Sequence, residues 1–111
     1  MKYALLIYNQ VWARDLPEDE REAVIGEYEA IFRSPGVLDG IQLQAADSAT
    51  TVRADNGEAL LSDGPFVDAK EYLGGLFVLE AENLDAATAV AQRIPAIHMG
   101  GAVEVRPIVE R

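Results

Sequence analysis

The sequence contains no cysteine. A chain without cysteine cannot form disulfides, use a thiol nucleophile, or bind zinc or an iron–sulfur cluster through thiolates. Long apolar runs are also missing: none approaches the roughly 18–20 residues that cross a bilayer. The run Tyr3 to Tyr8 is too short for the core of a signal peptide. We therefore expect a cytoplasmic protein that does not enter a membrane.

Basic residues and cofactor motifs are scarce. Nine Lys and Arg oppose 19 Asp and Glu, which gives a net charge of −10. A field of this sign repels phosphate backbones, so nucleic-acid binding is disfavoured. The sequence has no glycine-rich phosphate loop, no GxSxG or HExxH motif, and only one histidine. No cofactor and no metal site are expected.

The 111 residues suit a single domain, residues 1–111. The apolar spacing predicts two helices, one starting at a capping Asp15 and ending at Ser34-Pro35-Gly36, the other running from a capping Asn83 to Pro95. Strands are predicted within residues 2–9, 37–45, 50–54, 58–62, 74–81 and 102–109. Strands 50–54 and 58–62 flank Asp55-Asn56-Gly57, a strong hairpin turn signal.

Without that hairpin the order is βαββαβ, which predicts an α+β domain of ferredoxin-like topology with an inserted β-hairpin. This topology places the first and third strands of the motif, 2–9 and 74–81, at the centre of the sheet. Both are apolar on their two faces, yet two helices can cover only one face. A second copy stacked sheet to sheet is the expected cover, giving a homodimer, and a hairpin folded over the face is the alternative.

The densest group of chemical side chains follows the hairpin. Residues 63–75 read Asp-Gly-Pro-Phe-Val-Asp-Ala-Lys-Glu-Tyr-Leu-Gly-Gly. Asp63 beside Lys70 could hold a polar substrate or move a proton, since an ion pair of this kind lowers the pKa of a carboxylate. The structural alternative is a rigid turn in which Asp63 caps backbone amides and Lys70 points to water.

Asp63-Gly64-Pro65-Phe66, with Lys70-Glu71 and Leu73-Gly74-Gly75, resembles the signature of the DGPF-domain branch of the YCII-related family. Further matching segments span nearly the whole chain: Met1-Lys2-Tyr3, Leu5-Leu6-Ile7-Tyr8, Thr51-Val52-Arg53, Ile94-Pro95-Ala96 and Val103-Glu104-Val105-Arg106-Pro107. The resemblance implies a dimeric α+β barrel. Some members resemble small-molecule enzymes and others companions of alternative sigma factors. A histidine near the first helix, proposed for simpler members to work with an aspartate, has no counterpart here.

The predicted site combines six residues. Asp63 and His98 are the candidate acid/base pair, and Lys70, Arg53, Tyr8 and Arg106 are the candidate substrate contacts. Structural roles compete with each: a loop histidine is commonly a surface residue, the arginines can pair with acidic neighbours, and Tyr8 can fill core.

Two functions follow as hypotheses. The first is binding of a small polar metabolite in a cleft beside the Asp63–Lys70 loop, with acid/base chemistry left open. The second is a non-catalytic regulatory or protein-binding module that uses the acidic residues of the first helix.

Overall fold

The computed structural model describes residues 1–111. Its elements follow in the order β1 (Lys2–Asn9), η1 (Ala13–Asp15), α1 (Glu18–Phe32), β2 (Val37–Gln42), η2 (Ala46–Ser48), β3 (Thr50–Asp55), β4 (Glu58–Asp63), β5 (Tyr72–Glu80), α2 (Leu84–Ala91), η3 (Pro95–His98) and β6 (Ala102–Pro107), where η marks a short 3-10 helix. No helix is long and apolar enough to cross a membrane.

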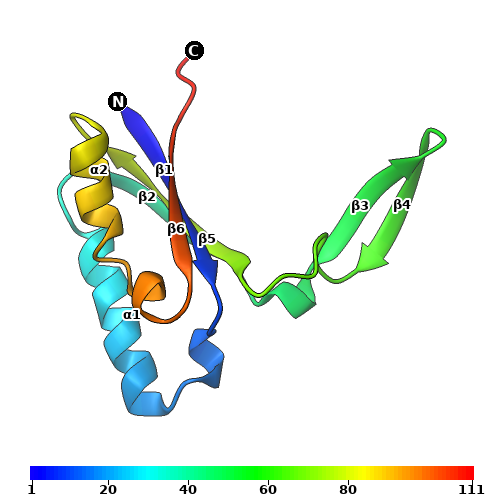
Figure 1. Ribbon diagram of the computed structural model, residues 1–111, viewed down its shortest axis with the longest axis horizontal. Coiled ribbons are helices and arrows are strands. Elements are labelled where there is room, and N and C mark those ends of the chain that lie inside the picture. Colours follow the sequence, from blue (N-terminus) through cyan, green and yellow to red (C-terminus); the bar gives the residue numbers. More distant parts are fainter.

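The main sheet is antiparallel in the order β2-β5-β1-β6. This order confirms the α+β, ferredoxin-like prediction, including β1 and β5 at the centre (Figure 1). The last strand, β6, lies at an edge. Pro107, which lacks an amide donor, is tolerated at that edge. Between β1 and β5 the register shifts, because Ile7 pairs with Gly75 while Tyr8 pairs with Leu73.

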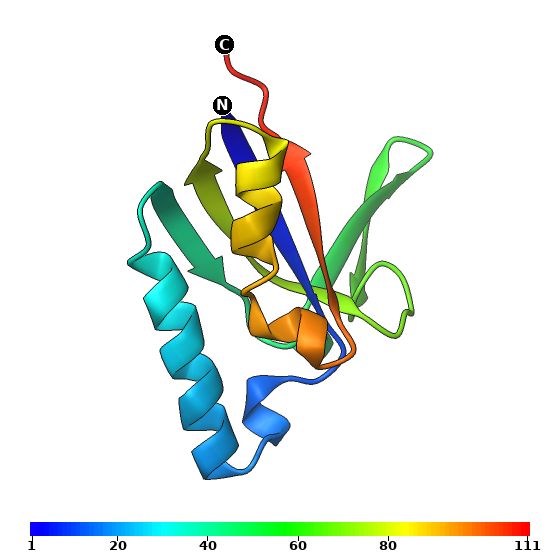
Figure 2. The same cartoon turned by 60° about the vertical axis from the view of Figure 1, so that its left-hand side comes forward.

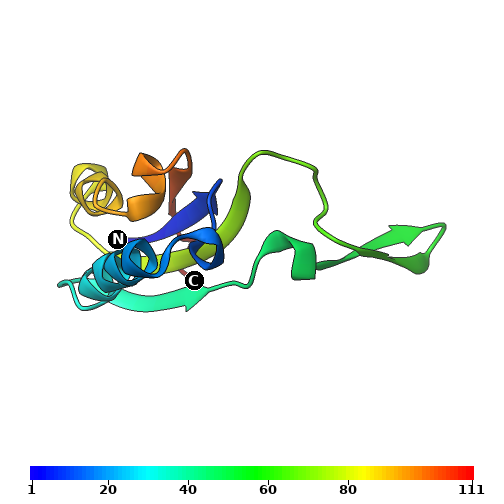
Figure 3. The ribbon, with the colours of Figure 1, turned by 90° about the horizontal axis from the view of Figure 1, so that it is seen from below.

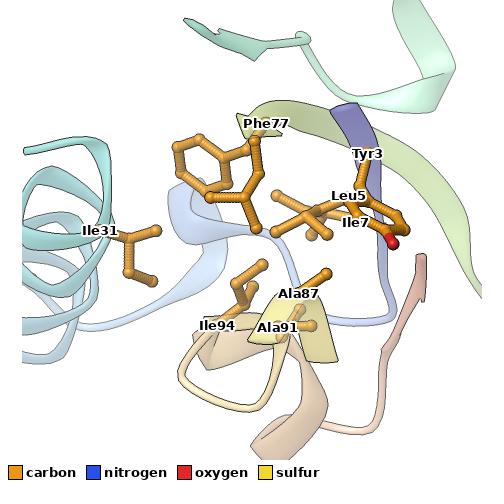
Figure 4. Close-up of a cluster of buried hydrophobic side chains, with 10 residues drawn as sticks. Tyr3, Leu5, Ile7, Ile31, Phe77, Ala87, Ala91 and Ile94 are labelled. Carbon is orange, nitrogen blue, oxygen red and sulfur yellow. The ribbon is translucent and has the colours of Figure 1, made fainter. Parts of the chain in front are cut away.

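Both helices cover the same face of the sheet, and the core lies between the helices and that face (Figures 2 and 4). Alternate β1 residues Tyr3, Leu5 and Ile7 point into it. They meet a set of buried residues from β5, the helices and the segment after α2, comprising Phe77, Leu79, Ile31, Ala87, Ala91, Ile94 and Ala96. The predicted cap of the second helix is confirmed, because Asn83 Oδ1 accepts from the Ala86 amide at 2.9 Å.

The start of α1 differs from the prediction. Asp15 belongs to η1, and the residue before α1 is Pro17, with no side-chain cap. Pro17 occupies the cap position, and its carbonyl oxygen accepts the first hydrogen bond of the helix, from the Arg21 amide at 2.8 Å. Of the residues of α1 only Ile31 is buried, whereas Ile25 and Phe32 are 43% and 50% exposed.

The hairpin β3–β4, which we call the arm, projects away from the main sheet on the side opposite the helices (Figures 1 and 3). Asn56 and Gly57 have φ of 51° and 81°, confirming the expected turn. The arm raises the radius of gyration to 15.7 Å, against about 13 Å for a compact chain of this length. It does not fold over the open sheet face, so that alternative is wrong for the protomer.

The face opposite the helices is apolar and uncovered within the protomer. Register places Leu6 beside Leu76, and Ala4 beside Val78, on this face. These side chains are half-buried by their own sheet neighbours, whereas the residues that alternate with them are buried under the helices. Charges lie toward its margins, where Arg106 pairs with Glu104 and the N-terminal ammonium with Glu80.

Candidate functional site

A cavity of about 310 Å³ lies between α1, η1 and the helix-covered face of the sheet; we call it the α1 cavity. Fifteen of its 21 lining residues are hydrophobic, a composition typical of small-molecule sites. Most of the wall comes from three segments: residues 7–16, which comprise the end of β1 and the chain through η1; the inner side of α1; and the neighbouring ends of β2 and β5. Trp12, Val24, Phe32, Leu43 and Met99 are among the apolar residues on it.

Glycines at this end of the sheet leave space that side chains and backbone atoms of other segments occupy. A Cβ at Gly74 would collide with the Asn9 amide, and one at Gly40 would lie 2.8 Å from the Phe32 ring. At Gly75 a Cβ would lie 2.5 Å from the carbonyl oxygen of Ile41 on the adjacent strand. The Gly74-Gly75 pair therefore permits a close approach of the chain's own groups from β1 and β2.

Few polar side chains line the α1 cavity: Asn9, Gln42, Glu29 and the phenol of Tyr28. The Tyr28 ring stacks on Phe77 with centroids 6.4 Å apart. Burial raises the pKa of Tyr28, a hydrogen bond with the Ala96 backbone lowers it in part, and Glu27 adds to the increase. The phenol is thus neutral near neutral pH and can offer a hydrogen bond. With the amides of Asn9 and Gln42, it can orient a ligand that has an apolar body and a polar group.

The raised pKa of Tyr28 gives stability a dependence on alkaline pH. Above about pH 10 an unfolded tyrosine releases its proton, while folded Tyr28 retains it. The unfolded chain then binds fewer protons, so the free energy of unfolding falls as pH rises from there through the folded pKa. Tyr28→Phe is expected to make this decline shallower in urea unfolding measured at steps above about pH 9. Parallel curves for the two proteins would contradict the assignment.

A second depression lies beside the Asp-Gly-Pro-Phe loop; we call it the loop cleft. It is more open than the α1 cavity and is lined by the loop, by the segment around η2 and by Tyr8 and Leu73. Leu43 borders both hollows. Inside the loop, the Tyr72 hydroxyl donates to Asp68 at 3.1 Å and accepts from the Ala69 amide, so the cleft wall is held by short local contacts.

Of the six residues predicted from sequence, only Tyr8 lines either hollow. Lys70 is exposed in the loop. His98 is exposed at the end of η3, and η3 lies well away from the arm in Figures 1 and 3. Arg106 pairs with an acidic neighbour, the structural role given above as its alternative. Its guanidinium donates to the Glu104 carboxylate at 2.6 and 3.0 Å.

Arg53 and Asp63 both lie on the arm but on opposite faces. Residues directly across an antiparallel pair share a face and successive residues alternate. Arg53 pairs with Leu60, whereas Asp63 pairs with Thr50 and shares the face of Leu61. The Arg53 guanidinium lies 5.0 Å from the centre of the Phe66 ring, a cation–π contact. Asp63 is exposed and makes no side-chain hydrogen bond, so it does not act as the expected backbone cap.

Sequence reasoning missed the α1 cavity. Its polar residues, Asn9 and Gln42, lie at strand ends and far apart in the chain, with no motif to join them. A signal was nevertheless present: Trp12, the single tryptophan, follows β1 in a segment that Gly74 of β5 allows to pack closely.

Comparison with known proteins gives one family and one relative. The model of the YCII-related domain matches residues 1–111. Uncharacterized protein R00369 of Rhizobium meliloti (strain 1021) is 33% identical over an alignment of 118 positions, which covers 97% of this chain and 92% of that protein.

Proposed function

The chain belongs to the YCII-related family, and from this premise we propose that it binds a small organic molecule in the α1 cavity. The observation that supports this most strongly is the cavity itself, whose mainly apolar wall carries a few polar groups. The ligand class that fits has an apolar, ring-sized body and one neutral polar group. This modifies the small polar metabolite expected from the sequence, because the wall is mainly hydrophobic.

The ligand's polar group would meet Asn9 and Gln42. Asn9 ends β1 and Gln42 ends β2, while Tyr28 lies on α1, so the polar groups of the cavity come from both the sheet and the helix. An amide side chain can both donate and accept, so these residues suit a carboxamide, ester or ketone better than an ion. Glu29 of α1, which also lines the cavity, disfavours an anionic ligand, since like charges repel.

Binding can be tested with naphthalene-2-carboxamide, a two-ring aromatic amide. Trp12 is the only tryptophan, so its indole N–H gives one NMR signal that reports on the cavity wall. Val24→Phe should raise the Kd of this probe by about tenfold or more, equivalent to about 1.4 kcal/mol, because the larger ring occupies cavity volume.

Ala23→Phe is the matched control. Ala23 precedes Val24 on α1, is exposed and does not line the cavity. Its Kd should stay near that of the unmodified protein. Equal Kd values for the two variants would contradict the assignment of the site.

A second copy on the open sheet face is the partner we propose. Its support is the apolar row formed by Leu6, Leu76 and neighbouring residues, which the helices leave uncovered. Closed two-fold dimers are the commonest assembly and bury such a face against itself. The homodimer predicted from the sequence is thus retained as a proposal.

Acid/base chemistry by Asp63 and His98 stays a prediction from the sequence. The protomer holds them on separate elements, β4 and η3. The regulatory alternative likewise stays a prediction. Its acidic residues at the start of α1 are exposed, which a solvated helix face explains equally well.

A further inference from the structure

The two faces of the arm differ in what covers them. One face carries Thr51 and Arg53, and both contact the chain's own loop: Thr51 Oγ1 donates to the Gly64 carbonyl at 2.7 Å, and Arg53 stacks on Phe66. We call this the loop side of the arm. Its contacts tie the arm to the segment that follows β4.

The other face, which we call the bare side, has no such contacts. Register places the pairs Val52–Leu61 and Ala54–Ala59 next to each other on it. Val52 is 63% and Leu61 is 67% exposed. Four adjacent apolar residues without an interposed charge are unusual on the surface of a chain in which a quarter of the residues are charged.

A two-stranded hairpin is marginally stable on its own in water and needs a third layer or strand. The arm pairs with no other strand, since β3 and β4 form a separate two-stranded sheet. A protein surface packed on the bare side would bury its apolar residues and so supply the stabilisation that a lone hairpin lacks.

The protomer exposes more surface than a compact protein of its mass. The chain exposes 7569 Å², against about 6,000 Å² for a compact protein of this mass. The excess, on the order of 1,600 Å², exceeds the roughly 800 Å² that each partner contributes to a stable interface of standard size. One copy of this chain therefore has area for an extensive contact with a second.

The arm and the open sheet face lie on the same side of the molecule (Figures 1 and 3). Each strand of the arm has six residues, which gives a length of about 20 Å, twice the roughly 10 Å between stacked sheets. A second copy that packed its sheet on the open sheet face would therefore lie beside the arm. The arm is long enough to extend past the sheet of that second copy.

We infer that the arm is an interlocking element of a homodimer: the bare side, centred on Val52 and Leu61, packs on the second copy while the loop side stays on its own chain. Two-fold symmetry makes the contact reciprocal, so each copy holds the other. This inference rests on the homodimer proposed above, to which it adds the arm, and it does not depend on ligand binding in the α1 cavity.

Adjacent leucines of the arm provide a matched test by sedimentation equilibrium. Leu61 lies on the bare side and Leu60 on the loop side, and both are exposed in the protomer. Leu61→Glu should raise the dimer dissociation constant about a hundredfold or more, because each dimer would bury two unpaired carboxylates. Leu60→Glu, placed beside Arg53, should change it by about threefold or less.

Equal effects of the two substitutions, whether both dissociate the dimer or neither does, would overturn the assignment of the bare side. An unmodified chain that sediments as a single protomer at tens of micromolar would overturn the dimer contact and leave the face to another partner. The circular dichroism of each variant establishes that its protomer is folded.

The absence of native cysteine allows a second, independent measurement. A benzophenone attached to Asn56→Cys at the arm tip can be photolysed in a mixture of isotope-light and isotope-heavy protein. Light–heavy crosslinked peptides joining the tip to the body of the other copy are the expected product. Crosslinks confined to single chains would contradict the interlocking arm.

Discussion

Leu5→Ala should lower the free energy of unfolding by about 3 kcal/mol, within the 2–5 kcal/mol typical of buried leucine truncations. Leu5 is fully buried on the central strand β1, directly between Phe77 of β5 and Val105 of β6. Both neighbours are held by backbone ladders, so the cavity left by the lost atoms cannot readily close. Urea unfolding followed by circular dichroism measures the loss.

The expected loss is a large part of the roughly 5–15 kcal/mol that stabilises a domain of this size. Leu84→Ala is the control, because Leu84 is 52% exposed at the start of α2. It should cost only about 0.5 kcal/mol. Similar losses at the two leucines would contradict the placement of the core under the helices.

Gly75→Val is the second substitution with a large expected effect, a loss of about 3 kcal/mol or more in the free energy of unfolding. A Cβ at Gly75 would lie 2.5 Å from the Ile41 carbonyl oxygen and 3.5 Å from Gln42 Cα. These atoms belong to the backbone of β2 and cannot rotate away. The substitution would therefore push β2 from β5 and distort the α1 cavity that both strands line.

Gly26→Ala provides the opposite expectation. Gly26 lies within α1, and a Cβ there would meet nothing within 4 Å. Alanine should raise the free energy of unfolding by about 0.5–1 kcal/mol, since glycine is unfavourable inside a helix. Urea unfolding of both variants should thus show shifts of opposite sign; a tolerated Gly75→Val would contradict the close approach of β2.

The strand order of the main sheet was predictable because the hydrophobic pattern of each strand indicates which of its faces are buried. Apolar residues on both faces marked β1 and β5 as central, and Pro107 marked β6 as an edge. The turn Asn56-Gly57 fixed the arm's register. The same register places Arg53 and Asp63 on opposite faces, so their separation could have been derived from the sequence by counting from the turn.

The α1 cavity could not be predicted in the same way. Its volume depends on the distance between α1 and the sheet, which packing of Phe32 on Gly40 and of Asn9 on Gly74 sets. These contacts join residues more than five positions apart, and no local pattern encodes them. The start of α1 was missed for a local reason: Asp15 matched a capping signal, but it lies in the preceding turn η1, and Pro17 occupies the cap position of α1.

The central proposal, ligand binding in the α1 cavity, is tested most directly by identifying the protein methyl groups that the bound ligand contacts. Nuclear Overhauser effects can be recorded between the ring protons of naphthalene-2-carboxamide and methyl groups of the isotope-labelled protein. The α1 cavity predicts contacts to the methyls of Val24, Leu16 and Met99, which line it. Contacts only to Val67 and Leu73 would contradict it and place the ligand in the loop cleft.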